Sequence, residues 1–317
     1  MRTVGIDLGG TNVYAVVLDG DTVVGSAKRR TPVDGGRDGV LEAMAAAAGK
    51  ALKDGGLDLA DVSAVGIGTP GVVIDGTVGS SANVPGFDER FDLAGALREP
   101  LGRPVRVAND VTAAAVGEHR LGGGRGSDSL LCVFAGTGVG GGLILDGRPF
   151  EGVHGGAGEL GHVIVRQGGA VCPCGRRGCV EAYAGRRAME LTAERRHATG
   201  TPTILFDVMA EKGKTRATSG VFRTAFESGD LLVADLLQEA AEVLAAGIAS
   251  SVNLLDLDRV VLGGGLADKL GAPFQRWIEA ALQPLLFLQP PEVDVVAAEL
   301  GDDGGAVGAA LLAREVA

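Results

Sequence analysis

Apolar and polar positions along the chain alternate between short strand-like runs and longer stretches of helical periodicity. In the first part of the chain, three strands separated by tight turns precede a helix, and two further strands precede a second helix. The strands are predicted at 3–6, 13–18, 22–27, 62–67 and 105–108, and the helices at 38–52 and from the end of Asn109-Asp110 to about 121. Strands that alternate with helices in this way indicate an α/β architecture.

The same order begins again in the second part of the chain. A strand, a glycine-rich turn and a short second strand come first, and helices with two further strands follow. The strands are predicted at 129–135, 142–145, 259–262 and 293–297, the turn at 136–142, and the helices at 181–196, 221–257 with a break near 228–230, 267–284 and 306–314. Two copies of one order suggest a duplicated α/β plan, with 7–11 and 136–140 at matching places. We expect a ligand in the cleft between the halves.

Length and composition narrow the classes of protein. A chain of 317 residues is long enough for two domains, and its 53 glycines lie beside apolar runs, which favours phosphate-binding loops and tight turns over a linker. A net charge of -11 without a basic block makes the chain a poor candidate for nucleic-acid binding. We see no signal peptide and no run that would span a membrane, so we expect a cytoplasmic protein.

Three of the four cysteines and one histidine fall within residues 155–181. Three thiolates and one imidazole make a closed tetrahedral zinc site of the structural type, because no position remains open for a reacting water. Reduced cysteines in a metal cluster fit the cytosol. The predicted ligands are His162, Cys172, Cys174 and Cys179, while Cys132 lies in an apolar run and is predicted to be a core residue.

Two glutamates flank the predicted metal ligands. Glu159 lies three residues before His162, and Glu181 lies two residues after Cys179. If zinc holds both stretches, it can bring the two carboxylates into one pocket. Two carboxylates with the amide of Asn109 suit vicinal hydroxyls, each of which donates and accepts a hydrogen bond. The alternative is that both glutamates are surface residues.

Two glycine turns carry candidate phosphate chemistry. Residues 136–141 match the dinucleotide pattern G-x-G-x-x-G, but a strand rather than a helix is predicted next, so a nicotinamide site is rejected. We interpret this turn and the one at 7–12 as loops whose N–H groups receive phosphate oxygens, with plain tight turns as the alternative. Asp7 could hold magnesium through water. A third glycine run, Gly263-Gly264-Gly265, would let a flat base approach the backbone.

Asn109 and Asp110 stand between an apolar strand and a helix. Asp110 could simply cap the helix, as Asp and Asn commonly do. It could also be a general base at the floor of the cleft. A helix N-terminus lowers the pKa of a carboxylate, which leaves a weak base that is still adequate for phosphoryl transfer. Both roles of Asp110, as helix cap and as general base, are consistent with the sequence.

Taken in order, these segments resemble the ROK family of sugar kinases, repressors and open reading frames, and its glucokinases in particular. The most specific stretch is Cys-Pro-Cys-Gly-Arg-Arg-Gly-Cys-Val-Glu, which ends at Glu181. Two local departures occur: Asn12 stands where many relatives carry Lys, and Val111-Thr112 replaces a frequent Ala-Asn. The matching stretches are 7–12, 69–71, Asn83 within 81–86, 109–110, 136–142, 158–162, 172–181 and 263–265.

The resemblance implies a two-domain hexokinase- and actin-like α/β fold, with a ribonuclease-H-like core, a central cleft and a structural zinc loop. We place the small domain at 1–117 plus 301–317 and the larger one at 118–300. The implied activity is transfer of phosphate from ATP to the 6-hydroxyl of a hexose, with glucose expected first. N-acetylmannosamine, N-acetylglucosamine, mannose and fructose are alternative sugars, polyphosphate is an alternative donor, and a non-catalytic sugar-sensing regulator is an alternative function. The implied assembly is a homodimer or homotetramer.

The resemblance also implies roles for individual residues. Asp110 would be the catalytic base, Zn²⁺ would be structural, and Mg²⁺ would accompany ATP. His162 would bind zinc through one ring nitrogen and the sugar through the other. The implied sugar-binding set is Gly71, Asn83, Asn109, Asp110, Glu159, His162 and Glu181. The implied ATP-binding set is Asp7, Gly9, Gly10, Thr11, Asn12, Gly136, Thr137, Gly138, Gly263, Gly264 and Gly265.

Overall fold

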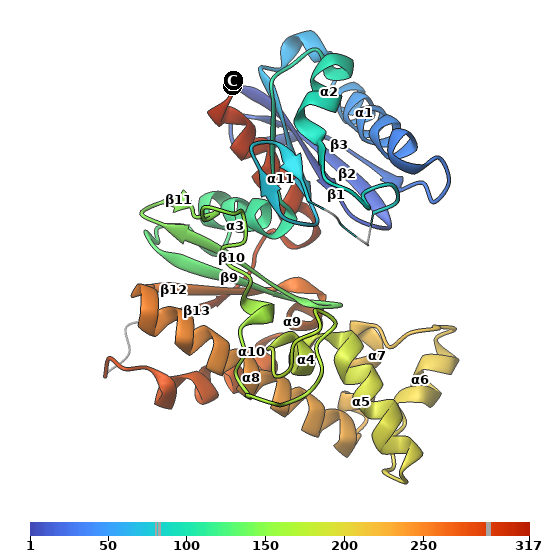
Figure 1. Cartoon of the computed structure of the whole chain (residues 1–317), viewed down its shortest axis with the longest axis vertical. Helices are drawn as coiled ribbons and strands as arrows, with labels where there is room; N and C mark the ends of the chain where they lie inside the picture. Colours follow the sequence, from blue (N-terminus) through green and yellow to red (C-terminus); the bar gives the residue numbers. More distant parts are fainter. Residues whose placement is uncertain (80, 82–83, 290–292) are drawn as a thin grey trace. The chain divides into compact units, whose positions relative to one another are not determined.

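The computed structural model describes residues 1–79, 81, 84–289 and 293–317, and these form two compact units (Figure 1). Unit 1 comprises Met1–Gly126, Gly142–Gly158 and Asp302–Ala317, and unit 2 comprises Ser127–Gly141 and Glu159–Gly301. The predicted domains were 1–117 plus 301–317 and 118–300. The units are defined by contacts between residues, and residues 142–158 fall in unit 1. The predicted domain limits stay a prediction.

The first sheet belongs to unit 1 and has the strand order β3-β2-β1-β4-β8. Its first three strands are antiparallel neighbours, and β4 and β8 join in parallel. Their bounds are β1 Arg2–Leu8, β2 Asn12–Asp19, β3 Thr22–Arg30, β4 Ala64–Thr69 and β8 Val105–Asn109. The helices of this unit are α1 Gly36–Asp54, α2 Leu93–Leu101, α3 Asp110–Leu121 and α11 Gly304–Leu312, with the 3-10 turns η1 Leu59–Asp61, η4 Gly301–Asp303 and η5 Ala313–Glu315 near them in the chain. A small sheet adds β5 Val73–Ile74, β6 Thr77–Val78 and β7 Phe91–Asp92.

The second sheet repeats the plan of the first, with the order β11-β10-β9-β12-β13. Strand β12 pairs in parallel with both β9 and β13, as β4 does with β1 and β8. The bounds are β9 Leu130–Ala135, β10 Val139–Leu145, β11 Arg148–Pro149, β12 Arg259–Gly263 and β13 Asp294–Ala297. The predicted duplication is thus confirmed, and the β1–β2 turn matches the β9–β10 turn. Strand β10 begins at Val139, three residues before the predicted start.

Helices make up most of the rest of unit 2. The predicted break in the long helical stretch is confirmed, because Asp230 caps a new helix by accepting a hydrogen bond from the N–H of Val233 at 3.0 Å. Two predicted helices are wrong in detail. The helix predicted at 181–196 is divided in two at Gly185, and the one predicted at 267–284 is divided in two at Gly271. The elements are η2 Leu160–His162, α4 Glu181–Ala184, α5 Arg186–Ala198, α6 Leu205–Glu211, α7 Ser219–Glu227, α8 Leu231–Leu255, α9 Gly264–Leu270, α10 Ala272–Leu282 and η3 Gln283–Leu285.

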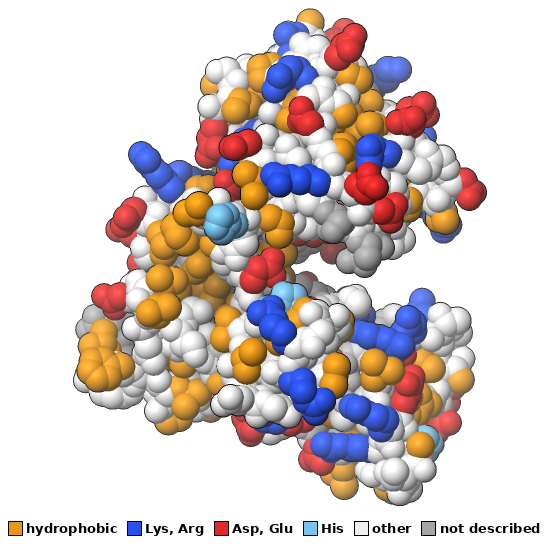
Figure 2. Space-filling model, in the orientation of Figure 1, with side chains coloured by type: hydrophobic (Ala, Val, Ile, Leu, Met, Phe, Trp, Pro, Cys, Tyr) orange, Lys and Arg blue, Asp and Glu red, His pale blue; other side chains and the backbone are white. Residues whose placement is uncertain are grey.

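Charged side chains lie mostly on the surface of the protein, and apolar residues fill most of its interior. Figure 2 shows charged side chains of both signs scattered over the face in view, with hydrophobic atoms between them. Cys132 in β9 is fully buried, as predicted. Among the helices of the described residues, none combines the length and apolar character that a membrane crossing requires.

Close backbone packing holds helix α11 against the first sheet (Figure 1). A Cβ at Gly66 in β4 would lie 1.8 Å from the carbonyl oxygen of Ala309, and one at Gly308 would lie 1.7 Å from that of Ala113 in α3. Glycine is therefore needed at both contacts, because any side chain would push the elements apart. This packing brings the first turn of α11 to Asp7, since a Cβ at Gly305 would lie 3.0 Å from the carboxylate.

Candidate active site and metal centre

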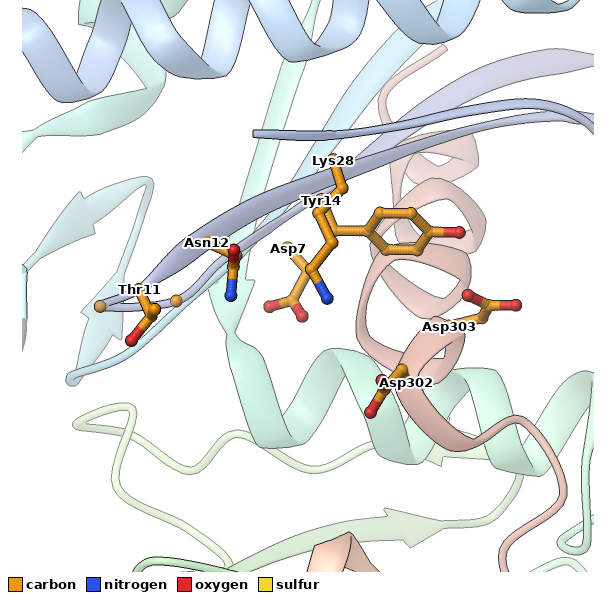
Figure 3. A pocket seen from close by; sticks show the side chains of 9 residues that line it. Asp7, Thr11, Asn12, Tyr14, Lys28, Asp302 and Asp303 are labelled. Atoms are coloured by element: carbon orange, nitrogen blue, oxygen red, sulfur yellow. The ribbon is translucent and has the colours of Figure 1, made fainter. Parts of the chain in front are cut away.

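A pocket of about 430 Å³ in unit 1 forms where β1 turns into β2 (Figure 3). The strand register aligns three side chains in one row, because Asp7 pairs with Tyr14 and Tyr14 pairs with Lys28. Side chains at paired positions share a face of the sheet, so this row forms one wall. All five residues predicted here for ATP binding line the pocket. Its lining is Asp7, Gly9, Gly10, Thr11, Asn12, Tyr14, Lys28, Asp302 and Asp303.

The β1–β2 turn is fixed by hydrogen bonds to its own residues and to the next strand. The N–H of Gly9 donates to the carbonyl of Asn12 at 2.9 Å, which closes the turn. Thr31 holds it from the end of β3: its hydroxyl donates to the carbonyl of Gly9 at 2.6 Å, and its N–H donates to that of Thr11 at 3.0 Å. These hydrogen bonds define the shape of the turn in this structure.

Asp7 is a half-buried carboxylate in an acidic setting. Burial and the neighbouring carboxylates of Asp110 and Asp302 together raise its pKa to about 7, and Lys28 opposes the rise. A carboxyl group in this state gains most from an added cation, which favours the ionised form. Magnesium with a nucleotide would be such a cation, since Mg²⁺ prefers carboxylate oxygens and water. The pocket thus fits the predicted role of Asp7.

Asn109 makes the N-terminal cap of α3. Its side-chain oxygen accepts hydrogen bonds from the N–H groups of Val111 at 2.9 Å and Thr112 at 3.2 Å, and its amide donates to the carbonyl of Gly71 at 3.1 Å. Gly71 has a φ of 101°, which suits glycine. Asp110 is the first residue of the helix and is half-buried, and its Oδ1 also accepts a hydrogen bond from the N–H of Val111 at 2.9 Å, so it contributes to the cap. Gly71, Asn109 and Asp110 are therefore brought together, while Asn83 lies outside the described residues.

The four predicted metal ligands converge in unit 2. One donor atom each from His162, Cys172, Cys174 and Cys179 lie within 4.8 Å of one another. The Sγ of Cys172 lies 3.7 Å from Nδ1 of His162, and the sulfurs of Cys174 and Cys179 are 3.8 Å apart. Tetrahedral zinc with Zn–S bonds of about 2.3 Å requires ligand separations of roughly 3.5–3.8 Å. The donor set and its spacing fit a structural zinc ion.

The loop that carries these donors is held by its own backbone. The N–H of Cys172 donates to the carbonyl of Arg176 at 2.9 Å, and Gly175, with a φ of 86°, makes the turn between them. The Nε of Arg176 lies 3.5 Å from the Sγ of Cys174, and this hydrogen bond is the largest of the interactions that together lower the pKa of that thiol to about 6. A thiolate is the form that binds metal.

Glu181 joins the metal loop to the β9–β10 turn. Its Oε2 accepts a hydrogen bond from the N–H of Val139 at 2.9 Å. Glu159 is exposed, and its backbone carbonyl accepts a hydrogen bond from the N–H of His162 at 2.9 Å. Glu159, His162 and Glu181 all lie in unit 2, and their role in sugar binding stays a prediction. No feature of the sequence by itself indicated the bond between Glu181 and Val139.

The β9–β10 turn is also held by the start of α5. The N–H of Arg186 donates to the carbonyl of Gly136 at 3.1 Å, and the N–H of Arg187 donates to that of Thr137 at 3.2 Å. The Nη2 of Arg186 donates to the hydroxyl of Thr137 at 2.7 Å. Arg186 was not among the residues predicted from the sequence to lie in the site. A cation directly after Gly185, where the helix begins again, was the available signal.

The third glycine run differs from the predicted turn. Gly263 ends β12 and helix α9 begins at Gly264, so the run starts a helix. Gly264 has a φ of 85°, and a Cβ there would lie 2.6 Å from the carbonyl oxygen of Ala135. This glycine is needed for packing against β9. The role of Gly263, Gly264 and Gly265 beside adenosine stays a prediction.

The sequence matches the ROK family over residues 3–316. The chain belongs to the ROK family. It is 33% identical over 324 residues to the glucokinase of Streptomyces coelicolor, a match that covers 99% of this chain and 98% of that protein. It is 29% identical over 318 residues to the N-acetylmannosamine kinase of Haemophilus influenzae, with 100% and 96% of the two chains covered.

Solved ROK structures share the fold. The crystal structure of a ROK family glucokinase from Streptomyces griseus, in complex with glucose and AMPPNP, has a TM-score of 0.83 and 34% sequence identity to this chain. The match covers 99% of this chain and 100% of that one. The predicted α/β, hexokinase- and actin-like fold is thereby confirmed, and this ROK protein has the architecture of the family's sugar kinases.

Proposed function

We propose that this ROK protein is an ATP-dependent hexose kinase that phosphorylates the 6-hydroxyl of D-glucose, giving glucose 6-phosphate and ADP. The observation that carries the proposal is the full-length similarity to the Streptomyces griseus glucokinase that holds glucose and AMPPNP. The pocket lined by Asp7 and the cluster of His162 with three cysteines support it, because the pocket could take the phosphates of Mg·ATP and the cluster could hold a structural zinc ion.

Asp110 is the proposed base that takes the proton from the 6-hydroxyl. Asp110 stands at the first position of α3, where its Oδ1 accepts a hydrogen bond from the N–H of Val111 at 2.9 Å. In phosphoryl transfer, little proton movement is needed before the bond to the leaving group breaks, so a weak base is adequate. The sugar hydroxyls are proposed to be bound by Gly71, Asn83, Asn109, Asp110, Glu159, His162 and Glu181.

The donor is proposed to bind at the two matching glycine turns. Mg²⁺ bound with ATP supplies neutralisation of phosphate charge, which is where most catalysis of this reaction arises. Asp7 and the turns 9–12 and 136–138 position the phosphate chain, and Gly263, Gly264 and Gly265 are proposed beside adenosine. The Cys₃His cluster would hold zinc in a purely structural role, because four protein donors leave no open coordination position.

N-acetylmannosamine is the second candidate substrate, because the Haemophilus influenzae kinase for that sugar matches the chain along its full length. Turnover divided by KM on a panel of glucose, mannose, fructose, N-acetylglucosamine and N-acetylmannosamine, with release of ADP as the signal, tests the choice. We expect glucose to give the highest value. A higher value for N-acetylmannosamine would replace glucose by that sugar, and no turnover with any hexose would leave the sugar-sensing regulator.

Asp110→Asn tests the proposed base. The variant should lose roughly a hundred- to ten-thousand-fold in turnover, the usual contribution of general base catalysis, while its melting temperature changes little. Asp92→Asn is the matched control, since Asp92 caps α2 in the same unit by accepting from the N–H of Gly95 at 2.7 Å. Near-full turnover of Asp110→Asn would remove Asp110 from the mechanism.

A further inference from the structure

Arg186 lies with its guanidinium at the tip of the β9–β10 turn. Its Nη2 donates to the hydroxyl of Thr137 at 2.7 Å, and its own N–H donates to the carbonyl of Gly136 at 3.1 Å. Thr137 is exposed, whereas Arg186 is half-buried. The side chain is thus anchored at its base by the backbone of the turn and reaches the exposed tip with its charged end.

The charge of Arg186 lacks a partner in the described part of the chain. No Asp or Glu described there is in ion-pair contact with it, and its Nε is buried without a hydrogen-bond acceptor. Burial lowers its pKa, and Glu190 opposes this from farther away. A half-buried guanidinium without a carboxylate is costly unless an anion binds it.

The neighbouring residue, Arg187, has its charge balanced by a carboxylate. Arg187 is paired with Glu190, with Nη1 and Oε2 3.0 Å apart, and the other oxygen of Glu190 accepts from the N–H of Ala217 at 3.2 Å. The carboxylate nearest the turn, Glu181, is bonded to the N–H of Val139. Both carboxylates therefore already have partners, and the guanidinium of Arg186 remains available to a ligand.

We propose that Arg186 binds the phosphate chain of the nucleotide donor at the β9–β10 turn. Phosphate oxygens match the planar fork of a guanidinium, whose Nη groups can donate to them in parallel. The inference rests on the proposed function, in which residues 136–138 receive ATP, and it adds a residue that the glycine turn alone does not supply. Arg186 thus provides the positive charge that this turn otherwise lacks.

The test compares Arg186→Ala, Arg186→Lys and Arg195→Ala. Arg195 lies on the same helix, is exposed, and donates from Nη2 to the hydroxyl of Thr192 at 3.0 Å, so it is a matched control. Binding of Mg·AMPPNP without sugar is measured by calorimetry, and KM is measured separately for ATP and for the hexose. Arg186→Ala should raise Kd and the KM for ATP about 10- to 100-fold, as expected for losing charge-assisted hydrogen bonds.

The two other variants should behave differently. Arg186→Lys should bind with intermediate affinity, because it keeps the charge and loses the fork. Arg195→Ala should match the wild-type protein. Equal Kd for Arg186→Ala and Arg195→Ala would overturn the proposal, and so would a lower melting temperature of Arg186→Ala with unchanged Kd, which indicates a structural role.

A further titration identifies the part of the ligand that is bound. Inorganic tripolyphosphate should also bind more weakly to Arg186→Ala, because it carries the same phosphate oxygens. Unchanged tripolyphosphate binding with weakened AMPPNP binding would place Arg186 at the nucleoside and overturn the proposal. If no hexose is phosphorylated by the wild-type protein, the proposed function fails, yet the AMPPNP comparison still decides the role of Arg186.

Discussion

Glu181 accepts a hydrogen bond from the N–H of Val139, with Oε2 and N 2.9 Å apart. Glu181 follows the predicted metal ligand Cys179 by two residues, and Val139 is the first residue of β10 after the glycine turn. One hydrogen bond therefore connects the segment that carries the clustered cysteines to the proposed phosphate-binding turn at 136–138. A Cβ at Gly138 would lie 2.2 Å from the same carboxylate oxygen, so the bond also requires glycine beside it.

Gly138→Ala should displace the carboxylate of Glu181. The clash is with the end of a flexible side chain, so the chain should still fold with a melting temperature close to that of the wild-type protein. Turnover divided by KM for the hexose should fall about tenfold or more, because small displacements of binding groups cost this much. Gly220→Ala in α7 is the control, since a Cβ there meets nothing closer than 3.9 Å. Wild-type kinetics for Gly138→Ala would mean that the bond to Val139 has no functional effect.

Cys174→Ser should lower zinc content and thermal stability together. Metal affinity contributes directly to folding free energy when the site exists only in the folded chain. Cys132→Ala serves as the comparison, because Cys132 is buried in β9 and is not one of the four clustered donors. That variant should keep its zinc, measured by elemental analysis, although the lost side chain lowers stability. A metal-free preparation as stable as the native protein would contradict a structural zinc site.

The half-buried carboxyl of Asp7 should make stability depend on pH. Its pKa rises from the ordinary value of 3.8 to about 7 in the fold, through burial, Asp110 and Asp302, with Lys28 opposing. Between these values the folded chain holds a proton that the unfolded chain has lost, so stability falls as pH rises through this window. Asp7→Asn should remove the fall.

Urea unfolding between pH 5 and pH 8, without nucleotide or divalent metal, measures this effect. At pH 8 Asp7→Asn should be the more stable protein, by on the order of 2–4 kcal/mol, whereas the two proteins should converge as the pH is lowered. Asp58→Asn is a suitable control on the same unit, since Asp58 is exposed. Parallel pH profiles for Asp7→Asn and the wild-type protein would show that Asp7 is not buried in its neutral form.

Much of the site could be predicted because its chemistry is local in the chain. The metal donors Cys172, Cys174 and Cys179 lie within eight consecutive residues, and the glycine turns each follow an apolar strand. Such spacing constrains geometry before any tertiary contact is known. Short elements were harder: strands of two residues, such as β5 and β6, and the helix α2 with its internal Pro100 carry little periodicity.

The place of Lys28 could not be predicted, because it depends on a β-bulge. If the antiparallel pairing continued without a shift from Asp19 and Thr22 at the turn, Lys28 would lie opposite Val13. The side chain of Val13 is buried, on the face of the sheet opposite to that of Asp7 and Tyr14. The register shifts between Val17 and Leu18, and this sets Lys28 opposite Tyr14 instead. A slip of one residue reverses the face of every side chain beyond it. The cation beside Asp7 thus follows from the register alone.

Gly308→Ala should be the most damaging of these substitutions for unit 1. Its Cβ would lie 1.7 Å from the carbonyl oxygen of Ala113 and 2.9 Å from the nitrogen of Gly117, so α11 and α3 would have to separate. Backbone atoms cannot move aside as a side chain does, so overpacking is expected to lower the free energy of unfolding by about 3 kcal/mol or more.

Gly49→Ala in α1 is the control. A Cβ there meets nothing within 4 Å, and the substitution should stabilise the protein by up to about 1 kcal/mol, as alanine does in a helix. Urea unfolding compares the two variants, and hydrogen exchange should show faster exchange at the amides of α3 and α11 in Gly308→Ala alone. Equal stability of both variants would mean that the two helices can part without cost, contrary to the packing that brings the first turn of α11 to Asp7.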